Sequence, residues 1–197
     1  MKIEYEGKNE ITSTIISVIR GVTRNKTITS LTIHVYASPP PLPDGVIEQL
    51  LKDYNTLQAL SLNITDELLP SSLNIVEVNT PPHLLFLSHP SLHTLTLPLD
   101  TAESAIELFT ILQTNTTLKA LRVKIKEERV YTSSMGTSLQ DMLTQNQTLK
   151  YLEINNVIPS SFLSFLTTGL RHNTSLQQLS VSIPLNEEMR TFIRPLQ

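Results

Sequence analysis

Residues 25–33 read Asn-Lys-Thr-Ile-Thr-Ser-Leu-Thr-Ile, and residues 54–62 read Tyr-Asn-Thr-Leu-Gln-Ala-Leu-Ser-Leu. Both stretches follow one phrase: Asn or a substitute stands two residues before Thr or Ser, and a hydrophobic-x-x-Leu-x-hydrophobic pattern comes next. The first apolar residue of this phrase returns at Leu92, Leu118, Leu149 and Leu176. A phrase that recurs every 26 to 35 residues predicts a solenoid, in which each unit buries its apolar side against its neighbours.

Each copy of the phrase ends in a predicted strand whose alternate residues are apolar and point inward. These inward sets are Leu31/Ile33/Val35, Leu60/Leu62/Ile64, Leu95/Leu97/Leu99, Leu121/Val123/Ile125 and Leu179/Val181/Ile183, and Leu152/Ile154/Asn156 keeps two apolar residues of three. Residues 73–78 carry the same spacing at a shorter interval and predict a seventh strand. Residues 2–6 are also strand-like and begin the array.

Between most of these strands the apolar residues follow a helical period, which predicts amphipathic helices over residues 10–24, 44–52, 136–145 and 160–172. Residues 100–103 read Asp-Thr-Ala-Glu and predict a capping box that opens a further helix before Leu118. Residues 186–196 are also helix-like. Alternating helices and short strands predict an α/β leucine-rich solenoid, a horseshoe of about seven strands with a concave parallel sheet and convex helices.

A recurring Asn stands where these helices are expected to end, at Asn25, Asn115, Asn146 and Asn173. Asn tolerates the left-handed backbone conformation of a helix stop, so we interpret these residues as helix terminators. Five Asn-x-Ser/Thr sequons occur, and four of them are these same residues, with Asn63 as the fifth. Helix termination is therefore favoured over glycosylation at these positions.

The composition excludes several classes of function. The chain has 197 residues and no cysteine, which excludes disulfides, thiolate nucleophiles and Cys-based zinc sites. Its formal net charge of -3 gives no long-range attraction to nucleic acid. Residues 1–10 are too polar for a signal peptide, and no apolar run approaches the ~20 residues of a membrane span. We expect a single domain over residues 1–197 in the cytosol, without membrane or nucleic-acid partners.

The repeated phrase, preceded by a helix, resembles the leucine-rich repeat of the ribonuclease-inhibitor-like type over about residues 10 to 183. The chain departs from this family where an Asn or Cys usually follows the last Leu by three residues and bonds the backbone of adjacent turns. Those positions hold Tyr36, Thr65, Pro81, Asp100, Lys126, Val157 and Pro184. The resemblance therefore predicts the sheet and the helices but not this interior Asn ladder.

The resemblance implies a protein-interaction scaffold with no catalytic residues. The family occurs as free-standing inhibitors and as the sensing end of cytosolic receptors with NACHT-type ATPase modules, so a fragment of a larger sensor is one alternative. A GTPase-activating repeat protein is another, although no motif here matches that family. The five glycines form no phosphate-binding cluster, and no cofactor is expected.

His83, His89 and His93 fall within eleven residues, but no carboxylate stands beside them. Solvated loop histidines are therefore favoured over a metal site, and we expect none. The adjacent carboxylates of residues 127–128 and 187–188 are interpreted as solvated charge on surface turns.

The outward face of the predicted sheet offers the best candidate binding site. Most outward residues are small, but the strands after Leu118 and Leu149 carry larger side chains, namely Arg122, Lys124, Tyr151, Glu153 and Asn155. Arg and Tyr are enriched in binding hot spots, so these residues are candidates for partner binding. A simple pairing of Arg122 with Glu153 explains two of them equally well. Three long connections, residues 37–43, 79–90 and 126–134, are candidate binding loops or plain spacers.

Overall fold

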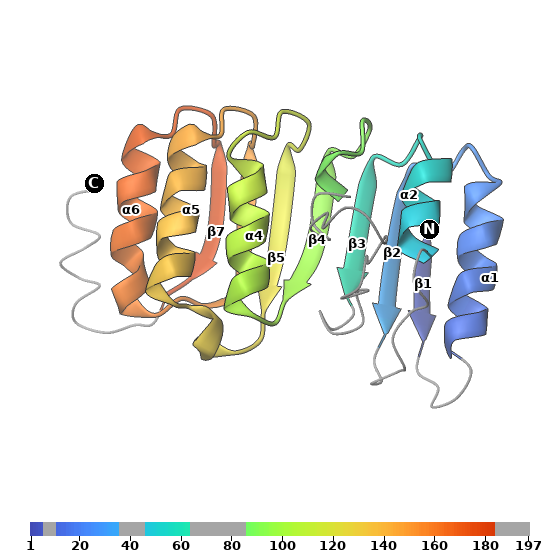
Figure 1. Ribbon diagram of the computed structural model, residues 1–197, viewed down its shortest axis with the longest axis horizontal. Coiled ribbons are helices and arrows are strands. Elements are labelled where there is room, and N and C mark those ends of the chain that lie inside the picture. Colours follow the sequence, from blue (N-terminus) through green and yellow to red (C-terminus); the bar gives the residue numbers. More distant parts are fainter. Residues whose placement is uncertain (6–10, 36–45, 64–85, 184–197) are drawn as a thin grey trace, which may run out of the picture.

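Seven parallel strands form one sheet whose strand order follows the chain (Figure 1). The computed structural model describes residues 1–5, 11–35, 46–63 and 86–183. The strands are β1 (Lys2–Tyr5), β2 (Ser30–Val35), β3 (Ala59–Asn63), β4 (Thr94–Leu99), β5 (Ala120–Ile125), β6 (Tyr151–Val157) and β7 (Gln178–Ser182). The helices are α1 (Ile11–Thr23), α2 (Val46–Asp53), α4 (Ala102–Leu112), α5 (Ser133–Gln145) and α6 (Leu163–His172).

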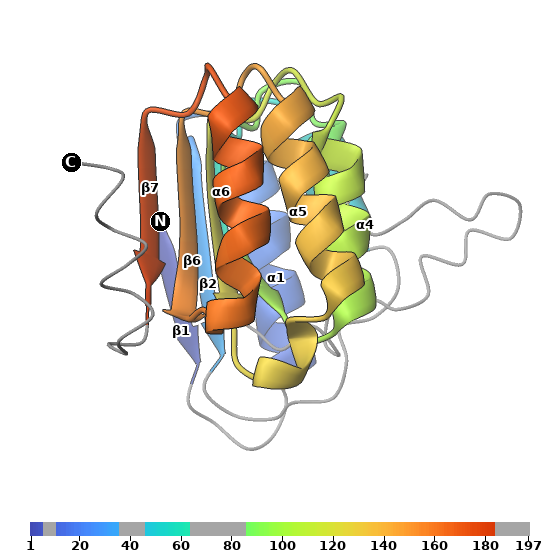
Figure 2. The same cartoon turned by 90° about the vertical axis from the view of Figure 1, so that its left-hand side faces the viewer.

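The molecule has two layers, the sheet and the helices. Figure 2 shows the strands as one thin layer and the helices as a second layer on one face of it. Within the described residues no helix covers the opposite face of the sheet. The repeated phrase has therefore produced the predicted α/β solenoid, with a leucine-rich-repeat-like arrangement of strand, helix and strand.

The core lies between the two layers and contains the inward residues of the strands. Leu95, Leu97 and Leu99 of β4 are fully buried, and Leu121 and Val123 of β5 are buried in the same way. The register aligns Leu95 with Leu121, so neighbouring units bury the same position of the phrase against each other. The apolar residues of β7, the last described strand, are only partly buried because that strand has one described neighbour.

Two helix starts differ from the sequence-based expectation. Helix α4 is capped by Thr101, whose side chain accepts a hydrogen bond from the Ser104 N–H, so the predicted capping box centred on Asp100 is wrong by one residue. Helix α5 begins at Ser133, three residues before the predicted start, because the Thr132 hydroxyl accepts from the Met135 N–H and caps it there. A hydroxyl cap thus determines both starts.

The strand predicted over residues 73–78 and the helix predicted over residues 186–196 lie outside the described residues. Strand β3 pairs directly with β4, with Ala59 opposite Thr94 and Ser61 opposite Thr96. Strand β1, which pairs with β2, is one of the seven strands that the described residues contribute to this sheet. The prediction of about seven parallel strands is therefore confirmed over the described residues, and the strand at residues 73–78 stays a prediction.

Helices α5 and α6 pack closely because each has a glycine at the contact. A Cβ atom placed on Gly136 would lie 2.4 Å from Cδ2 of Phe165, and one placed on Gly169 would lie 2.8 Å from Cβ of Leu143. No side chain fits at such distances without displacing its neighbour. The two glycines therefore set the separation of these helices.

Candidate protein-binding surface

Strands β5 and β6 place the predicted binding residues side by side on the uncovered face of the sheet. The register aligns Arg122 with Glu153, Ala120 with Tyr151, and Lys124 with Asn155. Residues two apart on a strand point to the same face, so all five predicted residues share it. We call Arg122, Lys124, Tyr151, Glu153 and Asn155 the sheet-face patch.

Three members of the sheet-face patch are joined by direct contacts. The Nε atom of Arg122 lies 2.6 Å from Oε2 of Glu153. The hydroxyl of Tyr151 donates a hydrogen bond to the same oxygen. The Arg122 side chain remains 46% exposed, whereas that of Glu153 is 19% exposed. One carboxylate therefore fixes a guanidinium and a phenol, and both remain accessible.

The electrostatics of the patch follow from these contacts. The hydrogen bond from Tyr151, together with Arg122, holds the pKa of Glu153 below its ordinary value. Partial burial and the nearby Arg122 lower the pKa of Lys124. Asn155 is exposed at the end of the patch. The patch thus combines two cations, one ionised carboxylate and one aromatic ring.

Elsewhere on this face the outward side chains are mostly small, but two of them are buried rather than exposed. Thr96 is 5% exposed and Pro98 is also buried, although both stand at outward positions of β4. Thr96 lies between Ser61 and Arg122 in the register of the sheet.

On strand β2, His34 lies near Glu4, with Nδ1 4.0 Å from Oε1. Burial, followed by the charges of Lys124 and Lys2, lowers the pKa of His34, while Glu4 acts in the opposite direction. At its ordinary pKa a histidine is largely neutral at pH 7, and the downward shift favours the neutral form further.

At the turns between helices and strands, one side chain per unit reaches back to the preceding unit. We call Tyr54, His89, Asn115, Asn146 and Asn173 the side-chain ladder. Tyr54 donates to Ile28 O, His89 Nε2 lies 3.1 Å from Tyr54 O, Asn115 Nδ2 2.8 Å from Leu87 O, Asn146 Nδ2 2.6 Å from Leu112 O, and Asn173 Nδ2 2.6 Å from Leu143 O.

The ladder corrects the interpretation of the recurring Asn residues. Asn146 has φ -72° and ψ 125°, and Asn173 has φ -83° and ψ 126°, so both have extended backbones rather than left-handed ones. Their Oδ1 atoms instead accept N–H groups of their own turns; for example, Asn146 Oδ1 accepts from Leu149 N at 2.8 Å. Each Asn therefore ends a helix by binding backbone on two sides.

Thr and Ser of the phrase add to the ladder. The Thr148 hydroxyl donates to Asn115 O at 2.9 Å, and the Ser175 hydroxyl donates to Asn146 O at 3.1 Å. In these two copies the Asn and the Thr or Ser of the phrase both donate to the preceding unit. Asn146 is 2% exposed, which leaves no room for a glycan and agrees with the structural interpretation of that sequon.

His89 belongs to this ladder and is not a solvated loop residue, as the sequence had suggested. It is 4% exposed, and its Nδ1 accepts from the Ser91 N–H while its Nε2 faces Tyr54 O. The tautomer with its proton on Nε2 satisfies both contacts. His93 is exposed, and His83 lies outside the described residues. Over the described part of the chain, no three His, Asp or Glu side chains lie close enough together to bind a metal ion.

Among the described residues, Asn156 makes an interior contact of the kind predicted to be missing, one residue before the position at which the family places its Asn. Asn156 Nδ2 donates to Ile125 O at 2.8 Å, which joins β6 to β5. The pairing of β6 with β7 shifts between Ile154 and Val157, on either side of this residue. The prediction was therefore wrong at this unit.

The connection after β5 packs against the core. Glu128–Val130 form a 3-10 turn in which Val130 is fully buried. The Tyr131 ring meets the Phe162 ring edge-on, with centroids 5.1 Å apart. Burial raises the pKa of Tyr131 to about 12. Of the three long connections, this one is a packed part of the scaffold; residues 37–43 and most of residues 79–90 lie outside the described residues.

Comparison with known proteins supports the fold. No protein-family model matches the sequence, and a comparison with curated proteins gives no match. Among solved structures, the chain is similar to one described as leiomodin-1 actin-binding site 2, with a TM-score of 0.54 and 13% sequence identity. The match covers 96% of this chain and 100% of that one. No helix among the described residues has the length and hydropathy needed to cross a membrane. The fold is thus that of a leucine-rich-repeat-like solenoid.

Proposed function

We propose that this protein is a non-catalytic interaction scaffold and that the sheet-face patch binds a protein partner. The observation that carries the proposal is the shared carboxylate of Glu153, which fixes Arg122 and Tyr151 on a face that no described helix covers. Side chains that are already fixed lose little conformational entropy on binding, so their contacts contribute more to affinity.

The nature of the partner is also a proposal. The similar solved structure is described as an actin-binding site, which makes actin the first protein to test. At 13% identity the likeness supports the fold, so actin enters only as a candidate. We further propose that residues 1–197 form one domain of the ribonuclease-inhibitor-like type in the cytosol.

Two double variants test the sheet-face patch. Arg122→Ala/Tyr151→Ala removes the two fixed contact groups, and Thr32→Ala/Ser61→Ala changes small, partly buried residues of the same face on β2 and β3. We expect the first pair to weaken binding of actin, or of a partner recovered by affinity pull-down, at least tenfold, or about 1.4 kcal/mol. The second pair should bind as the parent does. Equal binding by both variants would exclude the patch.

One assay distinguishes the proposed scaffold from the main alternative, a GTPase-activating protein. A GTPase-activating protein would accelerate GTP hydrolysis by small GTPases, whereas a scaffold would leave the rate unchanged. Acceleration of hydrolysis by the purified chain would overturn the non-catalytic proposal.

A further inference from the structure

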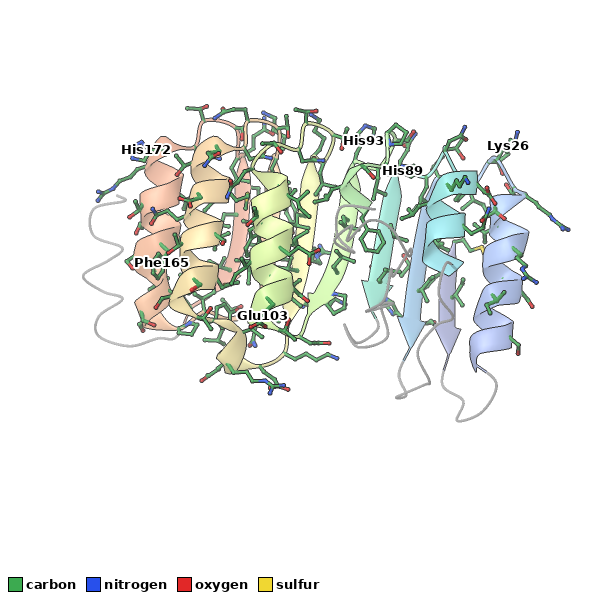
Figure 3. The ribbon with its side chains drawn as sticks, in the orientation of Figure 1. Lys26, His89, His93, Glu103, Phe165 and His172 are labelled. Atoms are coloured by element: carbon green, nitrogen blue, oxygen red, sulfur yellow. The ribbon has the colours of Figure 1, made fainter. Side chains whose placement is uncertain are left out.

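One rim of the solenoid is basic. Lys26, His93 and His172 lie along the rim where helices end and strands begin, whereas Glu103 lies at the opposite rim (Figure 3). The turns that form this rim in the described residues span 24–29, 54–58, 88–93, 113–119, 146–150 and 173–177, and they contain no Asp or Glu. In the last turns of the described helices, Asp53 alone is acidic, and it accepts a hydrogen bond from Gln49.

Three consecutive units place a basic side chain at the same position of this rim. His93, Lys119 and Lys150 each follow the first leucine of their phrase. The backbone joins them directly, because Lys119 N donates to His93 O at 2.8 Å and Lys150 N donates to Lys119 O at 2.8 Å. His93 and Lys119 are exposed, and Lys150 is half-buried. We call these three residues the rim row.

The cations of the rim have two different explanations. Arg20, Lys52 and Arg171 stand in last helical turns, where a positive charge offsets the helix dipole. The rim row lies beyond the helix ends, on the residues that enter the strands, so this effect does not account for it. Neither lysine of the row forms an ion pair with a described residue.

We propose that the rim row binds an acidic, extended segment of a partner protein. Neighbouring strands are about 4.8 Å apart, so the row spans about 10 Å, the length of three to four extended residues. Carboxylates of such a segment would face the ammonium groups of Lys119 and Lys150 and could accept a hydrogen bond from the His93 imidazole, an arrangement that steers association and selects the partner by charge.

Two features favour an acidic protein segment over nucleic acid or a lipid surface. The exposed side chains of the described turns include no Tyr, Phe or Trp on which bases could stack. The only large apolar side chains exposed by the described residues are Met1 and Val157. Met1 directly precedes β1, three strands from β4 in the order of the sheet, and Val157 stands at the far end of β6, so neither provides a membrane anchor beside the rim row.

The test uses a fluorescein-labelled peptide of twelve glutamates and fluorescence anisotropy at low ionic strength. We expect saturable binding to the parent chain that is lost as salt is raised. Lys119→Glu/Lys150→Glu should weaken binding at least tenfold, and Lys119→Gln/Lys150→Gln should weaken it less. Lys126→Glu/Arg129→Glu, on the opposite rim, changes the net charge equally and should bind the peptide like the parent. Circular dichroism melting establishes that each variant is folded.

Equal loss in the two charge-reversal pairs would overturn the proposal, because net charge alone would then explain binding. Tighter binding of a twelve-nucleotide oligo-dT, or of vesicles of phosphatidylcholine with 20% phosphatidylserine, would assign the rim to those ligands instead. Arg122→Ala/Tyr151→Ala should retain peptide binding. The proposal for the sheet-face patch and the proposal for the rim row can therefore be confirmed or overturned independently.

Discussion

The Nδ2 atom of Asn146 lies 2.6 Å from the carbonyl oxygen of Leu112, at the end of the helix one unit earlier. The same amide group lies 3.2 Å from Asn115 O, and its oxygen accepts the N–H groups of Thr148 and Leu149. A single buried side chain therefore satisfies backbone groups from two units. We therefore expect this arrangement to contribute to the stability of the array.

Asn146→Ala should destabilise the protein by roughly 2–4 kcal/mol, because unsatisfied buried backbone groups cost about 1–3 kcal/mol each and some become solvated. Urea unfolding measures the loss. Asn55→Ala is the matched control, since Asn55 is exposed and its substitution should change the free energy of unfolding by less than about 0.5 kcal/mol. Similar losses for the two variants would contradict a structural role for the ladder.

Leu121→Ala should cost roughly 2–5 kcal/mol, because it opens a cavity between units that share the core. Thr32→Ala, on the opposite face of the sheet, is the appropriate control and should cost little. Thr96 cannot serve in that role because it is buried. Thermal unfolding compares the variants, and equal shifts would show that the two faces have been assigned wrongly.

Glycine-to-alanine changes at two helical positions should have opposite signs. At Gly136 the new Cβ would meet the Phe165 ring, so Gly136→Ala should destabilise by about 1–3 kcal/mol. A Cβ atom placed on Gly21 would have no atom of another part of the chain within 4 Å. Gly21→Ala should therefore stabilise the protein by about 0.5–1 kcal/mol. Denaturant midpoints of the two variants on either side of the parent would confirm the close packing of α5 and α6.

The pKa of Glu153 should lie below its ordinary value. Tyr151→Phe should raise this pKa, because the hydrogen bond from the Tyr151 phenol contributes most to the shift. Because the pKa of Glu153 is lowered in the folded state, the ionised carboxylate stabilises the fold at pH values above its ordinary pKa. This stabilisation is lost as the pH falls through the lowered pKa of the folded state. An NMR titration of the carboxyl carbon measures both values. An unchanged pKa in Tyr151→Phe would show that the hydrogen bond is absent in solution.

The fold was predictable because the apolar residues of strands such as β4 recur with a period of two, and that period identifies the buried face directly. The contact of Arg122 with Glu153 was also predictable, since both stand at the same position of neighbouring copies. Whether these residues bind a partner stays a prediction.

The ladder was not predicted because a recurring Asn shows that a polar side chain is needed but not which backbone it meets. The alignment of His89-x-Ser91-Leu92 with Asn115-x-Thr117-Leu118 could have identified His89 as a ladder member. The burial of Thr96 was not predicted either, because the alternation along a strand identifies the face on which a residue lies but not how far its neighbours cover it.

Each ladder side chain donates to a carbonyl of the unit that precedes it, from Tyr54 through Asn173. The ladder therefore has a direction. The ribosome synthesises the chain from its N-terminus, so each acceptor carbonyl of the ladder is made before the side chain that donates to it. Each new unit can therefore pack against a unit that has already folded. Truncation from the C-terminal end removes donor side chains and leaves backbone carbonyls that water can solvate. Removal of an N-terminal unit instead leaves the ladder side chain of the next unit without its acceptor carbonyl. We therefore expect the units of this chain to fold in the order in which they are synthesised.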